Sequence, residues 1–489
     1  MSKPAGGTPT TIVLLVQLSN DERERSRHPV STPASEGVVV NTDQMTAAVD
    51  AQRRTWEVMA EAVKKADVSA ERFVDMMATD VGQTDSELVY EENKLQLRYY
   101  EPDEVKHETP IFIVYALVNR PYILDLQPDR SVIRRLLENG FEVYLIDWGE
   151  PSRLDQSLTM DDYVNRYMQN CADVVRERSD VDDYHLLGYC MGGTMSMLYA
   201  TQYPEEVRTL SLMATPLAFD GTGGILERWA NHYDPDTTVE ALGNLPAELL
   251  AVEFSMMDPV DQYITKYVNL YENIEDGDFV RNFARMEEWI WDGVDVAGEA
   301  YREFINDIYK DNQLVNGEYE LGDEPIDLSD IEMPAQQIIG KYDHIVPSES
   351  SKPFNDLISS DDERLVEFGA GHIGISVSGK AHAELWPDVC EWFAERDAST
   401  AGAETAETGT TTDPDVSAGG TISVDSAEAT SGHAATVDAV DGIGPTYAER
   451  LAGAGIETVA DLREHDPEEL AEIADTYPSR TENWLDDLT

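Results

Sequence analysis

Short apolar runs alternate with amphipathic stretches through the middle of the chain. The apolar runs are residues 111–117, 142–148, 184–187, 207–214, 335–340 and 364–368, and residues 94–100 alternate apolar with polar positions. Segments with helical spacing lie at 131–138, 159–178, 191–203 and 382–396. Strands that alternate with helices are typical of a largely parallel sheet covered by helices. The pattern predicts an α/β domain over residues 90–396.

This alternation stops between residues 216 and 334. The stretch is acidic, aromatic and helical in its spacing, with Trp229, Trp289 and Trp291 among its large side chains. A long insertion between two core strands is typical of a cap over the C-terminal edge of a sheet, where open α/β sheets place their chemistry. We predict a helical cap insertion over residues 216–334.

The N-terminal part of the chain lacks this pattern. Residues 1–44 are polar apart from a short apolar run, which predicts disorder. Residues 45–89 carry helical spacing from Met45 to Val63, which predicts an N-terminal helical segment.

A composition change follows the last predicted helix. Residues 397–435 contain no Lys, Arg, Phe, Tyr or Trp, which predicts a disordered acidic linker over 397–436. Residues 437–489 regain helical periodicity around Gly442-Ile443-Gly444 and resemble a small all-α helix-hairpin-helix module. This segment carries 14 acids and 3 arginines, a net charge of −11, which opposes contact with nucleic acid. We expect it to dock to protein.

The charge balance is strongly acidic. The 96 Asp and Glu against 35 Lys and Arg give a net charge of −61, spread along most of the chain. Because high salt screens such self-repulsion, we infer a halophilic source. The charge argues against binding to nucleic acid or anionic membranes. No run approaches the roughly 20 apolar residues of a membrane span, and we expect a cytoplasmic protein.

One of the three cysteines lies in a chemically informative place. Cys171 and Cys390 lie among apolar residues and are expected in the core. Cys190 is the centre of Gly188-Tyr-Cys-Met-Gly192, between an apolar run and a helical segment. This is the strand–turn–helix context of a nucleophile elbow, with Cys in place of Ser. A helix N-terminus beside a thiol favours its thiolate.

A thiol nucleophile needs a base and a group that orients the base. Asp343 and His372 each follow a predicted strand, in the chain order nucleophile, acid, histidine of α/β-hydrolases. We therefore predict an α/β-hydrolase fold with catalytic Cys190, Asp343 and His372. His344 is the rival base.

Other polar residues near predicted strands are expected to be structural. His185 lies within an apolar run, and Asp125 and Asp147 precede the nucleophile in the chain. We expect His185 in the core, and Asp125 and Asp147, which also follow strands, to be structural. Thr159 and Asp162 form the spacing of a capping box at the start of a helix.

The oxyanion hole should be built from backbone N–H groups. We predict one donor at Met191, after the nucleophile, and the second at Val118 or Asn119, in the loop after the run 111–117. No nucleotide-binding motif and no Cys/His grouping with zinc spacing is present in the sequence, so we expect no cofactor and no metal.

Taken together, several segments resemble the polyhydroxyalkanoate synthases, and most closely the catalytic subunit of the class III type. The matching segments are Tyr115–Asp129, Tyr144–Gly149, Gly188–Gly193, Asp343–Pro347 and Gly371–Gly374. The similarity covers about residues 90–395. The tail 397–489 has no counterpart in the compact bacterial subunit, and tail and acidity together resemble the haloarchaeal branch.

This resemblance implies a function. It implies Cys190 as nucleophile with Asp343 and His372 as partners, (R)-3-hydroxyacyl-CoA as substrate, and a second synthase subunit (PhaE-like). The CoA thioester is then a substrate, and the protein is expected on polyhydroxyalkanoate granules with granule-associated proteins. A Cys-dependent hydrolase, such as a thioesterase or a dienelactone-hydrolase-like enzyme, and a non-catalytic granule scaffold are the alternatives.

Overall fold

The computed structural model describes residues 80–397 apart from 223, 231, 258–264 and 275. Further along it describes residues 437, 450, 451, 454, 456, 458–463, 465–474, 481 and 485. The predictions for residues 1–44, for 45–79 and for nearly all of the linker 397–436 lie outside the described residues. The two compact units, Met1–Thr421 and Ile422–Thr489, are described separately.

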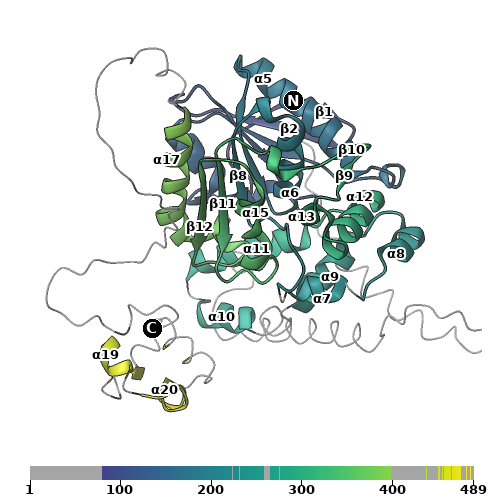
Figure 1. Cartoon of the computed structure of the whole chain (residues 1–489). Helices are drawn as coiled ribbons and strands as arrows, with labels where there is room; N and C mark the ends of the chain where they lie inside the picture. Colours follow the sequence, from purple (N-terminus) through teal and green to yellow (C-terminus); the bar gives the residue numbers. More distant parts are fainter. Residues whose placement is uncertain are drawn as a thin grey trace, which may run out of the picture. The chain divides into compact units, whose positions relative to one another are not determined.

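An eight-stranded sheet forms the centre of the first unit (Figure 1). Its strands, in spatial order, are β1 (Glu87–Glu92), β2 (Leu95–Tyr100), β6 (Val143–Asp147), β3 (Ile111–Val114), β7 (Tyr184–Tyr189), β8 (Val207–Met213), β11 (Ala335–Gly340) and β12 (Glu363–Phe368). The pairs β1–β2 and β2–β6 are antiparallel, and all later pairs are parallel. The α/β fold class is therefore confirmed.

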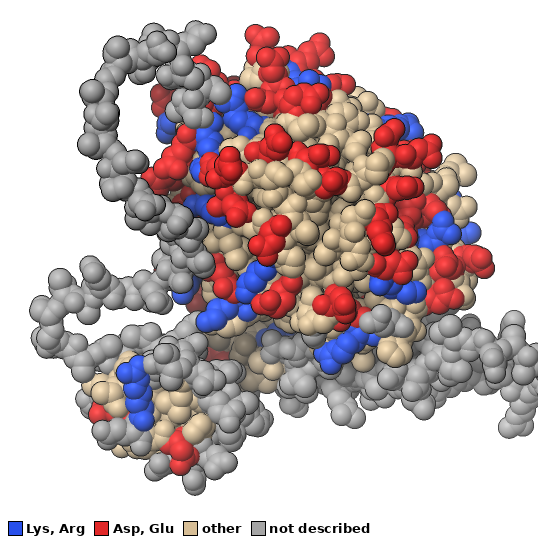
Figure 2. All heavy atoms as spheres, in the orientation of Figure 1, with Lys and Arg blue, Asp and Glu red and all other residues tan. Residues whose placement is uncertain are grey.

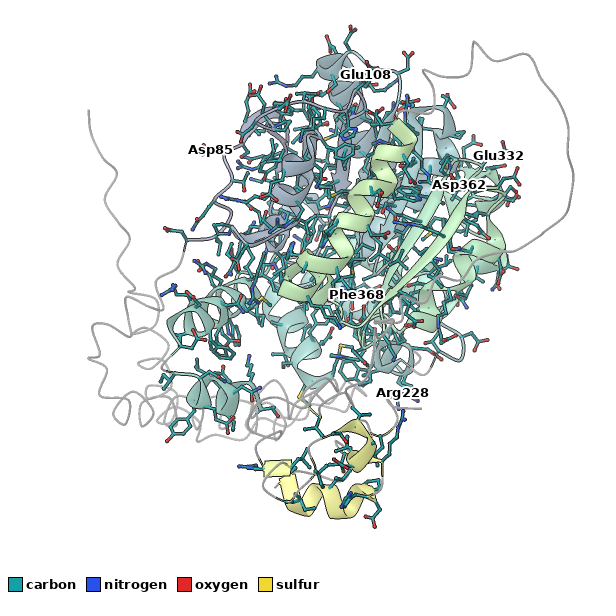
Figure 3. The ribbon with its side chains drawn as sticks, turned by 90° about the vertical axis from the view of Figure 1, so that its left-hand side faces the viewer. Asp85, Glu108, Arg228, Glu332, Asp362 and Phe368 are labelled. Carbon is teal, nitrogen blue, oxygen red and sulfur yellow. The ribbon has the colours of Figure 1, made fainter. Side chains whose placement is uncertain are left out.

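Helices connect the parallel strands and cover the sheet. They are α4 (Val132–Asn139), η4 (Asp162–Met168, a π-helix), α5 (Gln169–Ser179), α6 (Met191–Gln202), α14 (Ser348–Ser351), α15 (Pro353–Leu357), α16 (Gly374–Val377), η9 (Ala381–Leu385, a π-helix) and α17 (Trp386–Asp397). Short 3-10 turns are η2 (Pro121–Leu124), η3 (Arg153–Asp155) and η5 (Pro204–Glu206), and β4 (Asp125–Gln127) pairs with β5 (Arg130–Ser131). Helix α17 packs against α4 and crosses the face of the sheet turned to the viewer in Figure 3.

The insertion that the sequence predicts as a cap lies between β8 and β11. It contains α7 (Ile225–Ala230), α8 (Pro235–Leu242), α9 (Ala247–Met257), α10 (Lys266–Glu272), α11 (Gly277–Trp291), α12 (Gly298–Glu303), η7 (Phe304–Lys310, a π-helix), α13 (Gln313–Asn316), the pair β9 (Glu320–Leu321) and β10 (Glu324–Pro325), and η8 (Leu328–Asp330). Helix α8 packs against α12, and α7 packs against η7. This insertion brings side chains from far along the chain to one end of the sheet.

Local sequence explains where several helices begin and end. The Ser131 side chain accepts a hydrogen bond from the Arg134 N–H at the start of α4, and Gly140 ends that helix in the left-handed region, with φ 95°. Thr159 and Asp162 form the predicted capping box: each backbone N–H donates to the other's side chain at 3.1 Å.

Two boundaries differ from the sequence prediction. Strand β1 begins at Glu87, inside the range 45–89 predicted as helical, and residues 80–86 form no helix. Antiparallel pairing with β2 makes this segment part of the sheet: Leu88 pairs with Arg98, and Tyr90 pairs with Leu97. The spacing of apolar residues within the segment does not indicate this pairing. Strand β3 ends at Val114, so residues 115–117 of the predicted strand are a buried loop.

The structural roles predicted for individual polar and sulfur residues are confirmed. Cys171 and Cys390 are buried, and His185 is fully buried with Nδ1 at 2.9 Å from Thr209 Oγ1. Asp125 accepts hydrogen bonds from the Thr84 N–H and hydroxyl and from the Ser131 hydroxyl. Asp147 accepts one from the Gly149 N–H.

Acidic side chains are the commoner charged groups on the face of the first unit shown in Figure 2. The red acidic groups are scattered among tan uncharged atoms, with fewer blue basic groups between them. Among the described helices, none is long and apolar enough to cross a membrane.

The described part of the second unit is small and helical. It contains α19 (Val459–Leu462) and α20 (Pro467–Ala474) around the buried residues Val437, Leu451, Ile456, Leu462, Leu470 and Ala474. The Thr458 side chain caps α19 in a capping box with Asp461. The predicted turn at Gly442–Gly444 lies outside the described residues.

Candidate active site

Cys190 occupies a strained turn between β7 and α6. Its backbone has φ 55° and ψ −125°, a conformation that side chains with a Cβ rarely adopt. Hydrogen bonds hold both of its peptide groups: its N–H donates to Met213 O at 2.9 Å, and its C=O accepts from the Gly193 N–H at 2.8 Å. The turn leaves Cys190 partly exposed, whereas Tyr189 and Met191 on either side are buried.

Two glycines allow α6 to start this close to the sheet. A Cβ at Gly192 would lie 2.1 Å from Val114 O at the end of β3. A Cβ at Gly193 would lie 1.8 Å from Thr215 Oγ1, just after β8. Since real Cβ atoms do not come this near, any other residue would push the helix away from the strand ends. Gly192 and Gly193 therefore determine how close Cys190, at the start of α6, lies to the strand ends.

Asp343 and His372 form a hydrogen-bonded pair at the same end of the sheet. Asp343 follows β11, His372 follows β12, and His372 Nδ1 lies 2.7 Å from Asp343 Oδ2. The other carboxylate oxygen, Oδ1, accepts from the N–H groups of Ile345 at 2.9 Å and Val346 at 2.8 Å. Figure 3 shows Phe368, the last residue of β12, at the opposite end of the strand from Asp362, which precedes it.

The pKa of His372 is raised by the groups around it. Burial by itself lowers the pKa, but the charges of Asp343 and Cys190 and hydrogen bonds with both raise it from 6.5 to about 10. Because Nδ1 donates to Asp343, Nε2 is the nitrogen available to the thiol. The structure thus brings Cys190, Asp343 and His372 together in the arrangement of a nucleophile, a base and an orienting acid.

Tyr189 contacts His372 through both its hydroxyl and its ring. Its hydroxyl donates to His372 O at 3.1 Å, and its ring stacks on the imidazole with centroids 5.5 Å apart. The rival base, His344, is exposed and has no such pairing with Asp343, so the structure favours His372.

The oxyanion hole predicted at Met191 and at Val118 or Asn119 stays a prediction. Met191 is the first residue of α6, so its N–H has no partner within that helix. Asn119 has φ 63°, and the neighbouring Arg120 C=O accepts a hydrogen bond from Trp289 Nε1 at 2.8 Å. Trp289 belongs to the cap, which thereby holds this loop. The choice between Val118 and Asn119 as the second donor stays a prediction.

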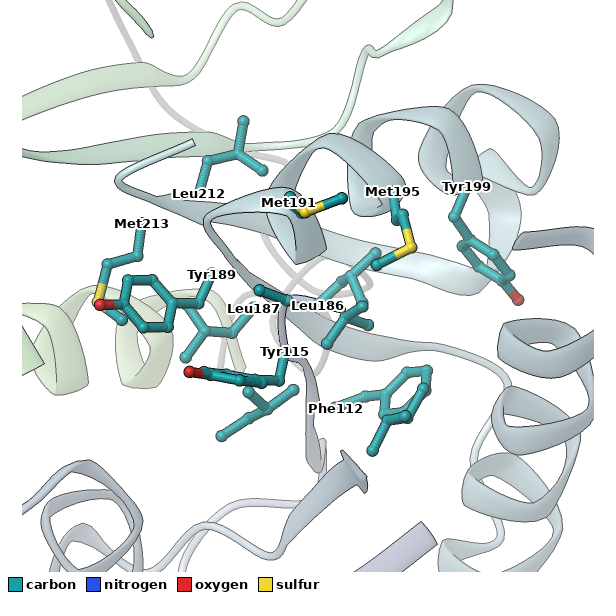
Figure 4. Packing of buried hydrophobic residues seen from close by; sticks show 14 of the residues in the cluster. Phe112, Tyr115, Leu186, Leu187, Tyr189, Met191, Met195, Tyr199, Leu212 and Met213 are labelled. Carbon is teal, nitrogen blue, oxygen red and sulfur yellow. The ribbon is translucent and has the colours of Figure 1, made fainter. Parts of the chain in front are cut away.

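Two buried tyrosines near Cys190 were missed by the sequence analysis. Tyr115 follows β3, and its ring lies beside that of Tyr189 with centroids 5.7 Å apart (Figure 4). Burial, with the charges of Tyr189 and Cys190, raises the pKa of Tyr115 well above its usual value. Tyr309 comes from η7, and burial followed by the charges of Cys190 and Asp343 raises its pKa. Tyr115 is the first residue of one of the segments that resemble polyhydroxyalkanoate synthases, whereas no local signal in the sequence marks Tyr309.

No cluster of three or more His, Cys, Asp or Glu that could hold a metal occurs among the described residues.

Comparison with known proteins identifies the family. A model of the alpha/beta hydrolase fold matches residues 109–378, a model of the poly-beta-hydroxybutyrate polymerase (PhaC) N-terminus matches 37–136, and a SAM-like helix-hairpin-helix tandem model matches 435–489. The poly(3-hydroxyalkanoate) polymerase subunit PhaC of Haloarcula marismortui is 53% identical over 466 residues, covering 90% of this chain and 98% of the relative. That of Haloferax mediterranei is 48% identical, with the same coverage. The chain belongs to the PhaC family of poly(3-hydroxyalkanoate) polymerases.

Further comparisons agree with this assignment. The PhaC subunit of Allochromatium vinosum is 44% identical over 329 residues, which cover 67% of this chain and 93% of the relative. PhaC proteins are acyltransferases, and the family resemblance, the α/β-hydrolase fold and the helix-hairpin-helix similarity predicted from the sequence are confirmed. The organisms of the first two relatives agree with the halophilic source inferred from the charge.

Proposed function

We propose that the chain polymerises (R)-3-hydroxyacyl-CoA, such as short-chain 3-hydroxybutyryl-CoA, into polyhydroxyalkanoate through a thioester on Cys190. The observation that carries this proposal is Cys190 at the start of α6 beside a histidine held by a buried carboxylate. Membership of the PhaC family supports acyl transfer as the reaction.

Acylation of Cys190 is the first step. His372 Nε2 takes the Cys190 proton, and the sulfur attacks the thioester carbonyl carbon of the substrate. The N–H of Met191, together with that of Val118 or Asn119, stabilises the resulting oxyanion. The bond between that carbon and the CoA sulfur then breaks, and the proton passes from His372 to the departing CoA.

Elongation is the second step. His372, oriented by Asp343, takes the proton of the 3-hydroxyl of the next unit, whose oxygen attacks the acyl group on Cys190. An ester bond forms, the carbon–sulfur bond to Cys190 breaks, and the proton returns to the thiolate. The first transfer exchanges one thioester for another, so the acyl group stays activated for ester formation. The buried rings of Tyr115 and Tyr309 help exclude the water that would hydrolyse it.

The proposal includes partners and a place in the cell. The cap exposes Val252, Met256, Val268, Tyr271 and Trp291, side chains suited to contact with protein or polyester. We propose a hetero-oligomer with a PhaE-like second subunit, on granules in the cytoplasm with granule-associated proteins. The CoA thioester acts as substrate, no cofactor is required, and nucleic acid is not a partner.

Release of CoA from (R)-3-hydroxybutyryl-CoA in high salt, followed with turbidity and with and without a second subunit, tests this function. Cys190→Ala should abolish both signals. Cys190→Ser should be severely impaired because an alcohol is a poorer nucleophile than a thiol near neutral pH. Polymer synthesis by Cys190→Ala would refute the mechanism. CoA release with free acid as product would identify a thioesterase or dienelactone-hydrolase-like enzyme instead, and no release would favour a granule scaffold.

A further inference from the structure

Two exposed lysines lie at the end of the sheet that carries the catalytic loops. Lys341 follows β11, and Lys380 directly precedes η9. Within the described part of the chain, neither of them forms an ion pair. The carboxylates of the neighbouring Glu349 and Glu367 are paired with Lys352, whose Nζ lies 3.0 Å and 3.7 Å from their Oε1 atoms. The two lysines are therefore available to an anion from solution.

Two aromatic rings lie beside these lysines. Lys341 Nζ lies 5.6 Å from the centre of the Tyr342 ring, and Lys380 Nζ lies 5.9 Å from the centre of the Phe368 ring. The Lys341 N–H donates to Phe368 O at 2.8 Å. A Cβ at Gly369 would lie 3.9 Å from Tyr342 Cε2, and Tyr342 is 49% exposed. We call these four side chains, Lys341, Tyr342, Phe368 and Lys380, the lysine–tyrosine patch.

The patch belongs to the same two loops as the catalytic pair. Tyr342 directly precedes Asp343, and its N–H donates to Ala370 O at 3.1 Å. Ala370 lies two residues before His372. Figure 3 shows Phe368 at the end of β12 from which this second loop leaves. Asp343 and His372 are buried, so the patch is the exposed part of the loops that hold them.

The CoA part of the proposed substrate carries groups that match this patch. At the far end of its flexible pantetheine arm, CoA has an adenine ring, a pyrophosphate and a 3′-phosphate. Ammonium groups donate charge-assisted hydrogen bonds to phosphates, and a base stacks on an exposed aromatic ring. Because salt at 1 M screens charges beyond about 3 Å, an acidic protein attracts CoA in high salt only through cations that touch its phosphates.

Resting on the proposed function, we propose that the lysine–tyrosine patch binds the 3′-phospho-ADP part of the CoA thioester. Tyr342 stacks on the adenine, and Lys341 and Lys380 donate hydrogen bonds to the phosphates. In the mechanism above, His372 passes its proton to the departing CoA sulfur, so the pantetheine arm leaves the site on the side of the His372 loop. The patch thus distinguishes CoA thioesters from thioesters of shorter thiols.

Two substrates isolate this contact. (R)-3-Hydroxybutyryl-CoA and (R)-3-hydroxybutyryl-pantetheine share the acyl unit and the arm, but only the first carries the nucleotide. Initial rates of thiol release are measured against substrate concentration for the full chain with its second subunit in high salt. Lys341→Gln and Lys380→Gln should each raise KM for the CoA thioester about two- to fivefold, the size of an exposed ion pair, without lowering kcat. The ratio of kcat/KM for the CoA thioester to that for the pantetheine thioester should fall by the same factor.

Lys106→Gln is the matched control, because it removes one exposed lysine at the opposite end of the sheet. Lys106 precedes β3, and its N–H donates to Gly140 O at 2.9 Å. This variant should keep the KM of both substrates. An unchanged KM for the CoA thioester after both patch replacements, or an equal rise with both substrates, would overturn the inference. If the unsubstituted protein releases thiol from neither thioester, the proposed function itself fails and this inference falls with it.

Discussion

Replacement of Asp343 by Asn tests the catalytic arrangement at its best-defined contact. Oδ1 of Asp343 accepts two backbone N–H groups, from Ile345 and Val346, and Oδ2 faces His372 Nδ1 at 2.7 Å. In Asp343→Asn the amide oxygen must stay with the two N–H donors, because the amide nitrogen cannot accept from them. The NH₂ group then faces Nδ1. His372 can meet it only as an acceptor, which places the ring proton on Nε2.

The expected loss is large because the histidine is held in the wrong tautomer. With its proton on Nε2, His372 cannot take the proton of Cys190. Loss of a hydrogen bond to a charged group costs about 1.5–3 kcal/mol. The tautomer adds to this, and the same substitution in a serine protease lowers kcat about 10⁴-fold. We expect kcat for CoA release to fall about 10³- to 10⁴-fold, equivalent to about 4–5.5 kcal/mol in the activation free energy.

The assay is the initial rate of CoA release at saturating (R)-3-hydroxybutyryl-CoA in high salt with the second subunit present. Asp361→Asn, at an exposed position before β12, is the matched control and should keep the normal rate. The melting temperature of Asp343→Asn should confirm a folded protein. A folded Asp343→Asn protein that kept more than about a tenth of kcat would refute the assigned role of the Asp343–His372 pair.

Two further predictions concern stability. Gly193→Ala should lower the free energy of unfolding by about 1–3 kcal/mol, because its Cβ would lie 1.8 Å from Thr215 Oγ1 and 2.8 Å from Thr215 Cβ. Gly379→Ala, with no atom near its Cβ, is the control, and equal melting temperatures for the two would contradict the packing argument. Burial raises the pKa of Glu253 in α9 to about 7, above the ordinary 4.5, so the buried charge destabilises the fold increasingly as pH rises from 4.5 through 7. Glu253→Gln should therefore raise the free energy of unfolding by about 1–3 kcal/mol at pH 8 and leave it unchanged at pH 4.5. Glu240→Gln, at an exposed position, is the control and should leave the free energy of unfolding unchanged at both pH values. An equal gain for Glu253→Gln at both pH values would exclude burial of its charge as the cause.

Much of the catalytic domain was predictable from local patterns. Strand β11 spans the predicted residues, and β7 extends the predicted run by two residues to the nucleophile turn. Apolar runs of this kind are informative because both faces of a parallel sheet are covered, so nearly every side chain of a strand must be apolar. Strand β1 was missed because it is defined by its pairing with β2 at the sheet edge, and its own burial pattern is weak.

The identities and chain order of the candidate catalytic residues were determined by the sequence alone. Each of these residues is recognisable from the few residues around it at the end of a predicted strand. Cys190 lies between glycines after one strand, Asp343 follows a second strand, and His372 follows the next. Local spacing also separates the cap from the sheet, because the change from strand–helix alternation to continuous helical spacing is visible along the chain.

Only the tertiary structure decided which of these features meet. It pairs Asp343 with His372 and leaves His344 exposed, and it buries Tyr309 of the cap where the charges of Cys190 and Asp343 help raise its pKa. Neither result follows from periodicity, because periodicity describes which face of an element is buried and not which distant element covers it. The packing of the cap onto the strand ends supplies that information, since Phe219 and Phe304 fix the phenol that the sequence leaves unplaced.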